Sequence, residues 1–393
     1  MAVNKISIEE FLLFAKNHPV LDVRSPGEYA HAHMPGAISL PLFNDEERVK
    51  VGTTYKQQSR ENAIKIGLDF FGPNMRGMVE KVEEIVSSGS RRNAGAKVKR
   101  QEAVSIDQLE KSPNIEKIDC PLPTANCVLL HCWRGGMRSA AVAWLLDLYG
   151  FKVYTLIDGY KCYRNWVLDQ FSKAYNFKII GGYTGSGKTL LLHALAKENN
   201  RIIDLEGLAN HKGSALGALG NPPQPTQEMF ENMLAEKLAV QTKTITIDSA
   251  PNCQMPAANC IWLEDESQRI GNLQIPMPLW YCMRKAPVYF VDIPFEERLS
   301  YLTDEYGVHE KAGLVNAIMR IQKRLGGLET KNAINFLLEN NFKESFRILL
   351  TYYDKYYLKG LQNRENPQSQ IKRITADTVH TQTNILLLQH ANS

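Results

Sequence analysis

The sequence predicts an α/β protein of two domains, the second built on a parallel sheet and followed by a helical C-terminal region. Two observations support this prediction. The chain has 393 residues, which exceeds the usual size of a single domain. In addition, an order of apolar strand, glycine-rich loop and helix occurs twice, first around Cys132 and again around Gly182. Each half is long enough to bury a core of its own.

Composition places the chain among ordinary globular proteins. Hydrophobic residues make up 44% and charged residues 22% of the sequence, and no apolar run approaches the roughly 20 residues that span a bilayer. The N-terminus lacks the features of a secretory signal, so we expect a cytoplasmic protein with no membrane partner. The seven cysteines show no CxxC spacing, which argues against a disulfide framework or a structural zinc site. The net charge of +4 permits a nucleic-acid partner without requiring one.

The first domain is expected to cover residues 1–172. It begins with an amphipathic helix from Ile8 to Lys16, and a short buried strand then ends in the charged residues Asp22 and Arg24. Residues 87–123 are polar and weakly periodic. We interpret this segment as an exposed insertion.

The remainder of the first domain repeats the α/β order. Strands are expected over Cys127–His131 and Lys152–Leu156, with a helix over Ser139–Tyr149 between them. The first of these strands leads directly into the loop that starts at Cys132. This order is typical of a small α/β unit with a loop at the end of a central strand.

The second domain is expected over residues 177–361. Its later strands should lie at Thr244–Asp248, Cys260–Glu264 and Pro287–Val291. Each ends in charge or a turn, and open α/β sheets bind ligands at such carboxyl ends. After Phe295 apolar residues recur at helical spacing, whereas the polar tail over 362–393 receives no assignment.

The loop at Cys132 has the features of an anion-holding turn. Backbone amides between a strand and a helix can converge on the thiol, and Gly135 and Gly136 let the chain pass close to the sulfur. The helix N-terminus and the guanidinium groups of Arg134 and Arg138 are expected to lower the pKa of the Cys132 thiol. We therefore predict a nucleophilic thiolate, with a plain structural cysteine as the alternative.

The segment from Gly182 to Thr189 matches the phosphate-binding pattern GxxxxGK[ST] between a strand and a helix. Its amides are expected to surround phosphate oxygens, with Lys188 neutralising them and Thr189 holding Mg²⁺. The predicted phosphate-binding residues are Gly182, Gly185, Ser186, Gly187, Lys188 and Thr189. The candidates for a metal-side carboxylate are Asp248, Glu264 and Asp265. Ordinary strand-end acids remain the alternative for each of these.

Two motifs of the first domain resemble the rhodanese family. LDVRSPGEYAHAHMPGAISLP resembles the N-terminal signature of that family, and CWRGGMRS resembles its active-site loop. The resemblance implies that Cys132 carries sulfur or selenium as a persulfide or perselenide, and that Asp22 and Arg24 help to arrange the site. Without it, both could simply cap a strand end. Phosphatases related to the rhodanese fold also use a Cys-to-Arg loop, and the length from Cys132 to Arg138 does not exclude their chemistry.

The fusion of such a domain to a phosphate loop resembles the tRNA 2-selenouridine synthases across nearly the whole chain. Further matching segments are IDGYKCYRNW, DLEGLANHKGSALG, NPPQPTQEMFEN, LEDESQRIG, KRLGG and YYDKYY. The resemblance implies that selenium from selenophosphate replaces sulfur at C2 of a wobble 2-thiouridine in tRNA. It also implies S-geranylation from geranyl diphosphate, which makes the sulfur a better leaving group. No tightly bound cofactor is expected besides Mg²⁺.

Contacts to RNA are harder to place, because no known RNA-binding module is visible. The densest basic run consists of Arg91, Arg92, Lys97, Lys99 and Arg100, for which a solvated loop is the plainer interpretation. His211, Lys212 and Arg269 belong to motifs expected to face the phosphate site. For these three, helix capping or a surface ion pair is the alternative.

Two other kinds of function stay open at this point. An ATP-dependent tRNA sulfurtransferase, or a nucleotide kinase with a fused rhodanese domain, would consume ATP in each turnover. A non-catalytic tRNA-binding or regulatory protein would need neither loop to be reactive. The intact Cys132 and Lys188 favour catalysis.

Overall fold

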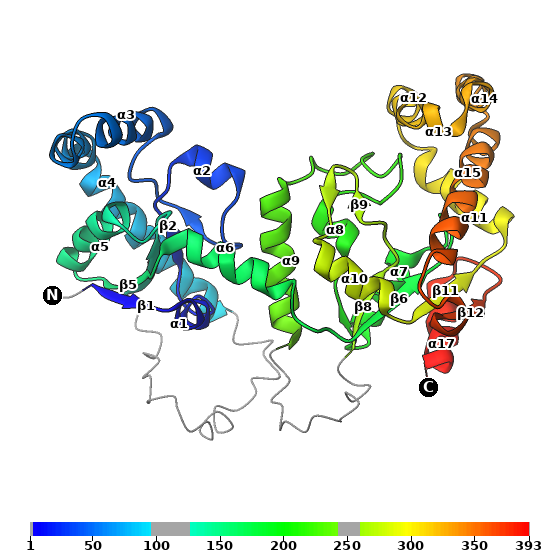
Figure 1. Ribbon diagram of the computed structural model, residues 1–393, viewed down its shortest axis with the longest axis horizontal. Helices are drawn as coiled ribbons and strands as arrows, with labels where there is room; N and C mark the ends of the chain where they lie inside the picture. Colours follow the sequence, from blue (N-terminus) through cyan, green and yellow to red (C-terminus); the bar gives the residue numbers. More distant parts are fainter. Residues whose placement is uncertain (1–2, 96–125, 243–259, 393) are drawn as a thin grey trace. The chain divides into compact units, whose positions relative to one another are not determined.

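The computed structural model describes residues 3–95, 126–242 and 260–392 (Figure 1). The chain forms two compact units, Met1–Trp166 and Val167–Ser393. Each unit contains its own parallel sheet. Among the described residues, no helix is long and apolar enough to cross a membrane.

The first unit is built on a five-stranded parallel sheet with the strand order β1-β5-β4-β2-β3. Its strands are β1 Asn4–Ile6, β2 Val20–Asp22, β3 Ile38–Ser39, β4 Cys127–His131 and β5 Lys152–Leu156. Every residue of the central strand β4 is buried. Cys132, which follows it, therefore lies at the carboxyl edge of the sheet.

In the described part of this unit, six helices accompany the sheet. They are α1 Ile8–Phe14, α2 Pro26–His31, α3 Asp45–Gln57, α4 Arg60–Gly95, α5 Met137–Tyr149 and α6 Gly159–Gln170. Ser7 and Asn44 begin α1 and α3 with reciprocal capping boxes, which satisfy backbone amides that a helix start leaves unpaired. The division between the units falls within α6, a few residues before the predicted boundary at residue 172.

The core of the first unit follows the periodicities of its sequence. Val128 and Leu130 of β4 are fully buried together with Val142 and Leu146 of α5, which are four residues apart on one helical face. The long helix α4 extends this core and continues to Gly95, so the start of the predicted 87–123 insertion is helical. The rest of that segment, and the side chains of the basic run, lie outside the described residues.

The second unit has a five-stranded parallel sheet with the order β12-β11-β6-β8-β7. Its strands are β6 Phe177–Gly181, β7 Arg201–Ile202, β8 Ile261–Glu264, β11 Val288–Asp292 and β12 Ile371–Thr375. A separate antiparallel pair is formed by β9 Arg269–Ile270 and β10 Leu273–Gln274. The predicted α/β class, with a parallel sheet in this half, is confirmed. The predicted strand that contains Asp248 lies outside the described residues.

The helices of the second unit fall into two groups. Those near the sheet are α7 Lys188–Lys197, α8 Leu205–Ala209, α9 Gln227–Thr242, α10 Met277–Lys285, α16 Pro367–Gln370 and α17 Thr381–Asn392. The others are α11 Phe295–Tyr306, α12 Lys311–Arg320, α13 Gln322–Leu325, α14 Gly327–Leu338 and α15 Phe342–Gln362, which lie together in Figure 1. This second group has its own hydrophobic core around Leu299, Leu314, Leu337 and Leu350. The predicted helical region is therefore confirmed.

The tail beyond residue 361, for which the sequence alone predicts no element, completes the sheet of the second unit. Strand β12 pairs in parallel with β11 along its whole length, from Ile371 opposite Val288 to Thr375 opposite Asp292. Ile385 and Leu388 of α17 then pack into the core beneath the sheet. The tail is thus part of the domain and not an appendage to it.

Candidate active sites in the two units

Cys132 lies in a buried position at the end of β4, with only 3% of its surface exposed. Its Sγ is 3.2 Å from Oγ of Ser139, in the first turn of α5. The Ser139 hydroxyl donates to the carbonyl of Gly136 at 3.0 Å, and a hydroxyl carries only one proton. Its oxygen is therefore placed to accept a hydrogen bond from the Cys132 thiol.

Backbone hydrogen bonds from the start of α6 fix the cysteine loop. The backbone amides of Tyr160 and Lys161 donate to carbonyls of the loop at 2.8 and 3.0 Å. Gly159 has a φ of +58°, and a Cβ there would lie 2.3 Å from the carbonyl oxygen of Cys132. Gly135 has a φ of +60° within the loop itself. Only glycine fits both positions, because a side chain would be strained at these φ values and would collide at Gly159.

The predicted supporting pair, Asp22 and Arg24, forms a buried two-pronged ion pair. Arg24 Nε and Nη2 donate to the carboxylate of Asp22 at 3.0 and 2.6 Å, and Nη2 also donates to the carbonyl of Ala32 at 2.7 Å. The guanidinium lies 3.7 Å from the ring centroid of Tyr160. The pair therefore reaches the cysteine loop through Tyr160, at the start of α6.

Of the two loop arginines, Arg138 is fixed by an acid from another element. Its Nη1 donates to Glu28 of α2 at 2.7 Å, and Arg48 of α3 approaches the other oxygen of Glu28 at 3.4 Å. Burial raises the pKa of Glu28, but hydrogen bonds from Arg138 and the Ser25 amide, together with the charges of Arg138 and Arg48, outweigh burial and lower the pKa overall. Arg134 is exposed. The loop thus carries one neutralised and one exposed guanidinium.

The phosphate loop lies between β6 and α7 of the second unit. Lys188 starts α7 and its Nζ donates to the carbonyl of Gly182 at 2.9 Å. Gly182, Gly185 and Gly187 have φ values of 155°, 81° and 69°. A Cβ on Gly182 would lie 2.4 Å from Oγ of Ser186, which explains why a close turn needs glycine there.

Two acids, the half-buried Glu206 and the buried Glu264, lie near the start of α7. The Thr189 hydroxyl donates to Glu206 at 2.9 Å. Burial raises the pKa of Glu206, and Lys188 opposes this only in part. Glu264 ends β8 and is fully buried, and burial and repulsion from Glu206 raise its pKa well above the usual value. Asp265, in contrast, is paired with Arg364 at 2.6 Å.

This arrangement decides which acids face Thr189. Asp265 accepts hydrogen bonds from Arg364 and from the Tyr357 hydroxyl, whereas Glu206 lies directly beside Thr189. Within the described ranges, no three His, Cys, Asp or Glu side chains form a metal cluster. The oxygen atoms of Thr189 and Glu206 are suitable ligands for Mg²⁺, but two ligands do not complete its coordination. As in other phosphate-binding sites, oxygens of the substrate and water would supply the rest.

The phosphate loop opens into a cavity of about 560 Å³. Lys212 and Asp265 line it together with Glu206, and Lys212 also forms an ion pair with Glu305 at 2.5 Å. Six tyrosines complete the wall, namely Tyr301, Tyr306, Tyr352, Tyr353, Tyr356 and Tyr357. His211 and Arg269, predicted to face this site, are not among the residues that line it. His211 is buried, and Arg269 is exposed and donates to the carbonyl of Gly271.

Comparison with known proteins supports both units together. The family model for the tRNA 2-selenouridine synthase AAA domain matches residues 175–384, which include the phosphate loop. A tRNA 2-selenouridine synthase from Sulfurovum sp. is 33% identical over 87% of this chain and 88% of its own length. The chain belongs to the tRNA 2-selenouridine synthase family. Synthases from Bdellovibrio bacteriovorus and Hydrogenovibrio crunogenus are 31% and 33% identical over 90% and 89% of this chain, and 91% of each of their own lengths.

Several residues that build the two sites in this family member are not singled out by the sequence. Glu28, Gly159 and Glu206 act through neighbours that are distant along the chain, so no local motif identifies them. Each nevertheless falls inside a segment that resembles the family, and the run YYDKYY supplies four of the cavity tyrosines. Those segments are the signal from which the three residues could have been found.

Proposed function

We propose that this protein is a tRNA 2-selenouridine synthase, which replaces sulfur by selenium at C2 of the wobble 2-thiouridine in tRNA. The observation that supports this most strongly is the resemblance to enzymes of that name over about nine-tenths of the chain, a span that reaches into both units. The substrates of the proposed reaction are tRNA, selenophosphate and geranyl diphosphate, and its place is the cytoplasm.

The first unit is proposed to be a rhodanese-like domain in which Cys132 carries selenium. A parallel sheet with Cys132 directly after its central strand supports this assignment. The N-terminus of α5 and the amides of the loop favour negative charge on the group that Cys132 carries. Asp22 and Arg24 are proposed to position the loop through Tyr160, and Gly135 and Gly136 to leave room for the carried atom.

The phosphate loop is proposed to hold the diphosphate of geranyl diphosphate. In this step the bond between geranyl C1 and the diphosphate oxygen breaks, a bond from C1 to the thiouridine sulfur forms, the N3 proton of the base passes to water, and diphosphate leaves. Lys188 and the loop amides would stabilise the charge of the departing group. Mg²⁺ held by Thr189, Glu206 and phosphate oxygens would supply further neutralisation. The tyrosine wall offers an apolar surface for the geranyl chain.

Selenium transfer is proposed to follow on the S-geranylated base. Selenophosphate supplies selenium at the oxidation level of selenide, and its phosphoryl group passes to water as phosphate. A disulfide takes up two electrons as this selenide joins the Cys132 thiol, which gives the perselenide. The perselenide attacks C2, the bond from C2 to sulfur breaks, and the geranyl group departs with the sulfur as a thiolate. Two thiols then reduce the remaining sulfur–selenium bond, which regenerates the disulfide, frees Cys132 and leaves selenium on C2. Alkylation makes this departure easier, because an alkylthiolate is a far better leaving group than a sulfur doubly bonded to carbon.

The test is mass spectrometry of wobble nucleosides from 2-thiouridine-containing tRNA incubated with the protein, with each co-substrate omitted in turn. We expect 2-selenouridine only when geranyl diphosphate and selenophosphate are both present, and S-geranyl-2-thiouridine when selenophosphate alone is omitted. Formation of 2-selenouridine without geranyl diphosphate would remove the alkylation step. A requirement for stoichiometric ATP would favour a nucleotide-dependent sulfurtransferase instead.

A further inference from the structure

A second cavity, of about 700 Å³, lies beside the cysteine loop in the first unit. Its walls come from α3, from α4 and from the residues between Cys132 and α5, including Trp133 and Arg134. This volume lies within the range of roughly 300–1,000 Å³ that is usual for small-molecule sites. Neither the carriage of selenium on Cys132 nor the phosphate loop requires such a space.

The cavity gathers large apolar side chains that the fold leaves uncovered. The exposed members of this set are Val49, Tyr55, Ile64, Leu68, Trp133 and Met137. Val49 and Leu68 are 57% and 56% exposed, although each would gain free energy by being buried. Contiguous apolar surface of this kind, on a folded unit with its own core, is typical of a binding site.

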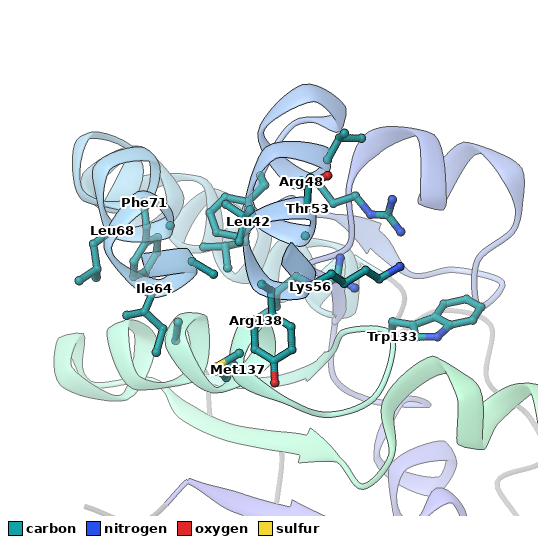
Figure 2. Close-up of a pocket in the computed structure, with 18 of the residues that line it drawn as sticks. Leu42, Arg48, Thr53, Lys56, Ile64, Leu68, Phe71, Trp133, Met137 and Arg138 are labelled. Carbon is teal, nitrogen blue, oxygen red and sulfur yellow. The ribbon is translucent and has the colours of Figure 1, made fainter. Parts of the chain in front are cut away.

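The cavity has an apolar side and a cationic side. Figure 2 shows Ile64, Leu68 and Phe71 on one side, whereas Arg48 and Lys56 extend on the other. The cations that line it are Arg48, Lys56, Arg134 and Arg138. Glu28 pairs with Arg48 and Arg138 and holds them in place. An occupant that combines an apolar body with negative charge fits this lining, because Lys56 and Arg134 add positive charge beyond the two guanidinium groups that share Glu28.

We propose that this cavity binds a hydrocarbon chain carried on the sulfur of a nucleobase, while the cationic side holds phosphates of the attached RNA strand. The inference rests on the proposed function, in which the S-geranylated base is such a molecule. Apolar walls suit the chain, and guanidinium and ammonium groups suit phosphate oxygens. Trp133 and Arg134, which directly follow Cys132, line this cavity, which would bring the carbon–sulfur bond of the base near the selenium carrier.

A filled cavity tests the proposal without touching the catalytic groups. Gly52 lies on α3, lines the cavity, and has no atom within 4 Å of a Cβ placed on it, so the side chain of Gly52→Leu can enter this space without a collision at its Cβ. Gly77→Leu on α4 is the matched control, because Gly77 is equally unobstructed but does not line the cavity. Leucine is a better helix former than glycine, so neither change should unfold its helix.

The measurement is the Kd for anticodon stem-loops that carry S-geranyl-2-thiouridine, S-methyl-2-thiouridine or 2-thiouridine at the wobble position. The unaltered protein should bind the geranyl RNA about ten-fold more tightly than the methyl RNA, since several methylene groups are buried. Gly52→Leu should abolish this preference and leave binding of the methyl RNA unchanged. Gly77→Leu should retain the preference.

Three results would overturn the inference. The first is equal binding of geranyl and methyl RNA by the unaltered protein, and the second is an unchanged preference in Gly52→Leu. The third is a Gly52→Leu defect confined to the KM for geranyl diphosphate, because the donor would then be the occupant of the cavity. The proposed function is contradicted by a different result, namely the absence of 2-selenouridine from the complete reaction. The preference for a longer chain is measured by binding alone, so its outcome is independent of the outcome of that reaction.

Discussion

The cysteine loop and the phosphate loop share the order of strand, turn and helix, but their electrostatic surroundings are opposite. In the first unit, Glu28 is paired with Arg138 and its pKa is lowered by that partner, against the effect of burial. In the second unit, Glu206 and Glu264 lie beside Thr189, and burial raises the pKa of both. The first site is electrostatically compensated, whereas the second concentrates acids whose burial Lys188 and Lys212 offset only in part.

This contrast indicates different tasks for the two turns. A site in which acidic and basic side chains already pair with one another can hold one thiol in a fixed geometry. A site with uncompensated acids beside a phosphate loop gains most when a cation and its phosphate ligand bind together. This contrast supports our proposal that the first loop holds the covalent carrier and that the second holds the transient diphosphate.

The largest expected effect is that of Cys132→Ser. Loss of the carrier thiol should lower 2-selenouridine formation by a factor of at least about 10³, in line with removal of a catalytic nucleophile. Geranylation should continue, so S-geranylated tRNA should accumulate. Mass spectrometry of the nucleosides gives both quantities in one sample, and continued selenation by this variant would show that Cys132 is not the carrier.

Lys188→Ala should reverse that pattern. Removing the ammonium from the phosphate loop should reduce geranyl transfer by about 10²–10³-fold, the effect typical of a lost group that stabilises developing charge. The rate of S-geranylation with saturating geranyl diphosphate measures this effect. Lys178→Ala on β6 is a suitable control, since it removes a lysine from the same unit but outside the loop. Undiminished transfer in Lys188→Ala would exclude the phosphate loop from that step.

Gly159→Ala should weaken the packing of the start of α6 against the cysteine loop. The added Cβ would meet the carbonyl of Cys132 at 2.3 Å in a left-handed conformation, so we expect a destabilisation of about 3 kcal/mol. Gly36→Ala also places alanine at a positive φ, of +80°, but meets nothing within 4 Å, so about 1 kcal/mol is expected. Hydrogen exchange of peptides from α2 and α6 measures the loss of stability in each of the two variants. Equal losses would contradict the argument that the contact with the Cys132 carbonyl adds to the cost in Gly159→Ala.

The smallest effects are two pH dependences of opposite sign. Because the folded pKa of Glu28 is lowered, its stabilisation is present above its unfolded pKa and is lost as the pH falls. Glu28→Gln should therefore destabilise the first unit by about 1–2 kcal/mol at pH 7 and by less near pH 4. The folded pKa of Glu264 is raised, so its ionisation weakens the fold as the pH rises, and Glu264→Gln should stabilise the second unit at pH 8.

Hydrogen exchange of each unit between pH 4 and pH 8, corrected for the intrinsic exchange rate and made with a chelator present, measures these two slopes. Slopes of the same sign in the two units would remove the electrostatic distinction between the loops. A flat response for Glu264→Gln alone would indicate that Lys188 already compensates that acid in the folded protein.

Local sequence was sufficient for the parts of the molecule that depend on neighbours along the chain. Glycine spacing and a preceding strand identify the turn that begins at Gly182, because the close approach of the chain requires glycine there. The strand before Cys132 can likewise be predicted from the sequence, since the residues from Cys127 to Leu130 are all apolar.

The parts that the sequence did not predict depend on contacts between distant segments. Strand β12 is polar on its exposed side and short, so only its pairing with β11 makes it a strand. Glu206 reaches Thr189 from a helix 17 residues further along the chain. Arg269 is the opposite case. Its motif predicts a position at the phosphate site, but its guanidinium donates a hydrogen bond to the carbonyl of Gly271 instead.

The division of labour between the loops is tested most directly by a bypass experiment. Lys188→Ala is given tRNA that already carries S-geranyl-2-thiouridine, together with selenophosphate, and the formation of 2-selenouridine is followed by mass spectrometry. We predict conversion at a rate close to that of the unaltered protein, with no conversion by Cys132→Ser. Failure of Lys188→Ala to convert this RNA while it remains folded would contradict the assignment of the two steps to separate loops.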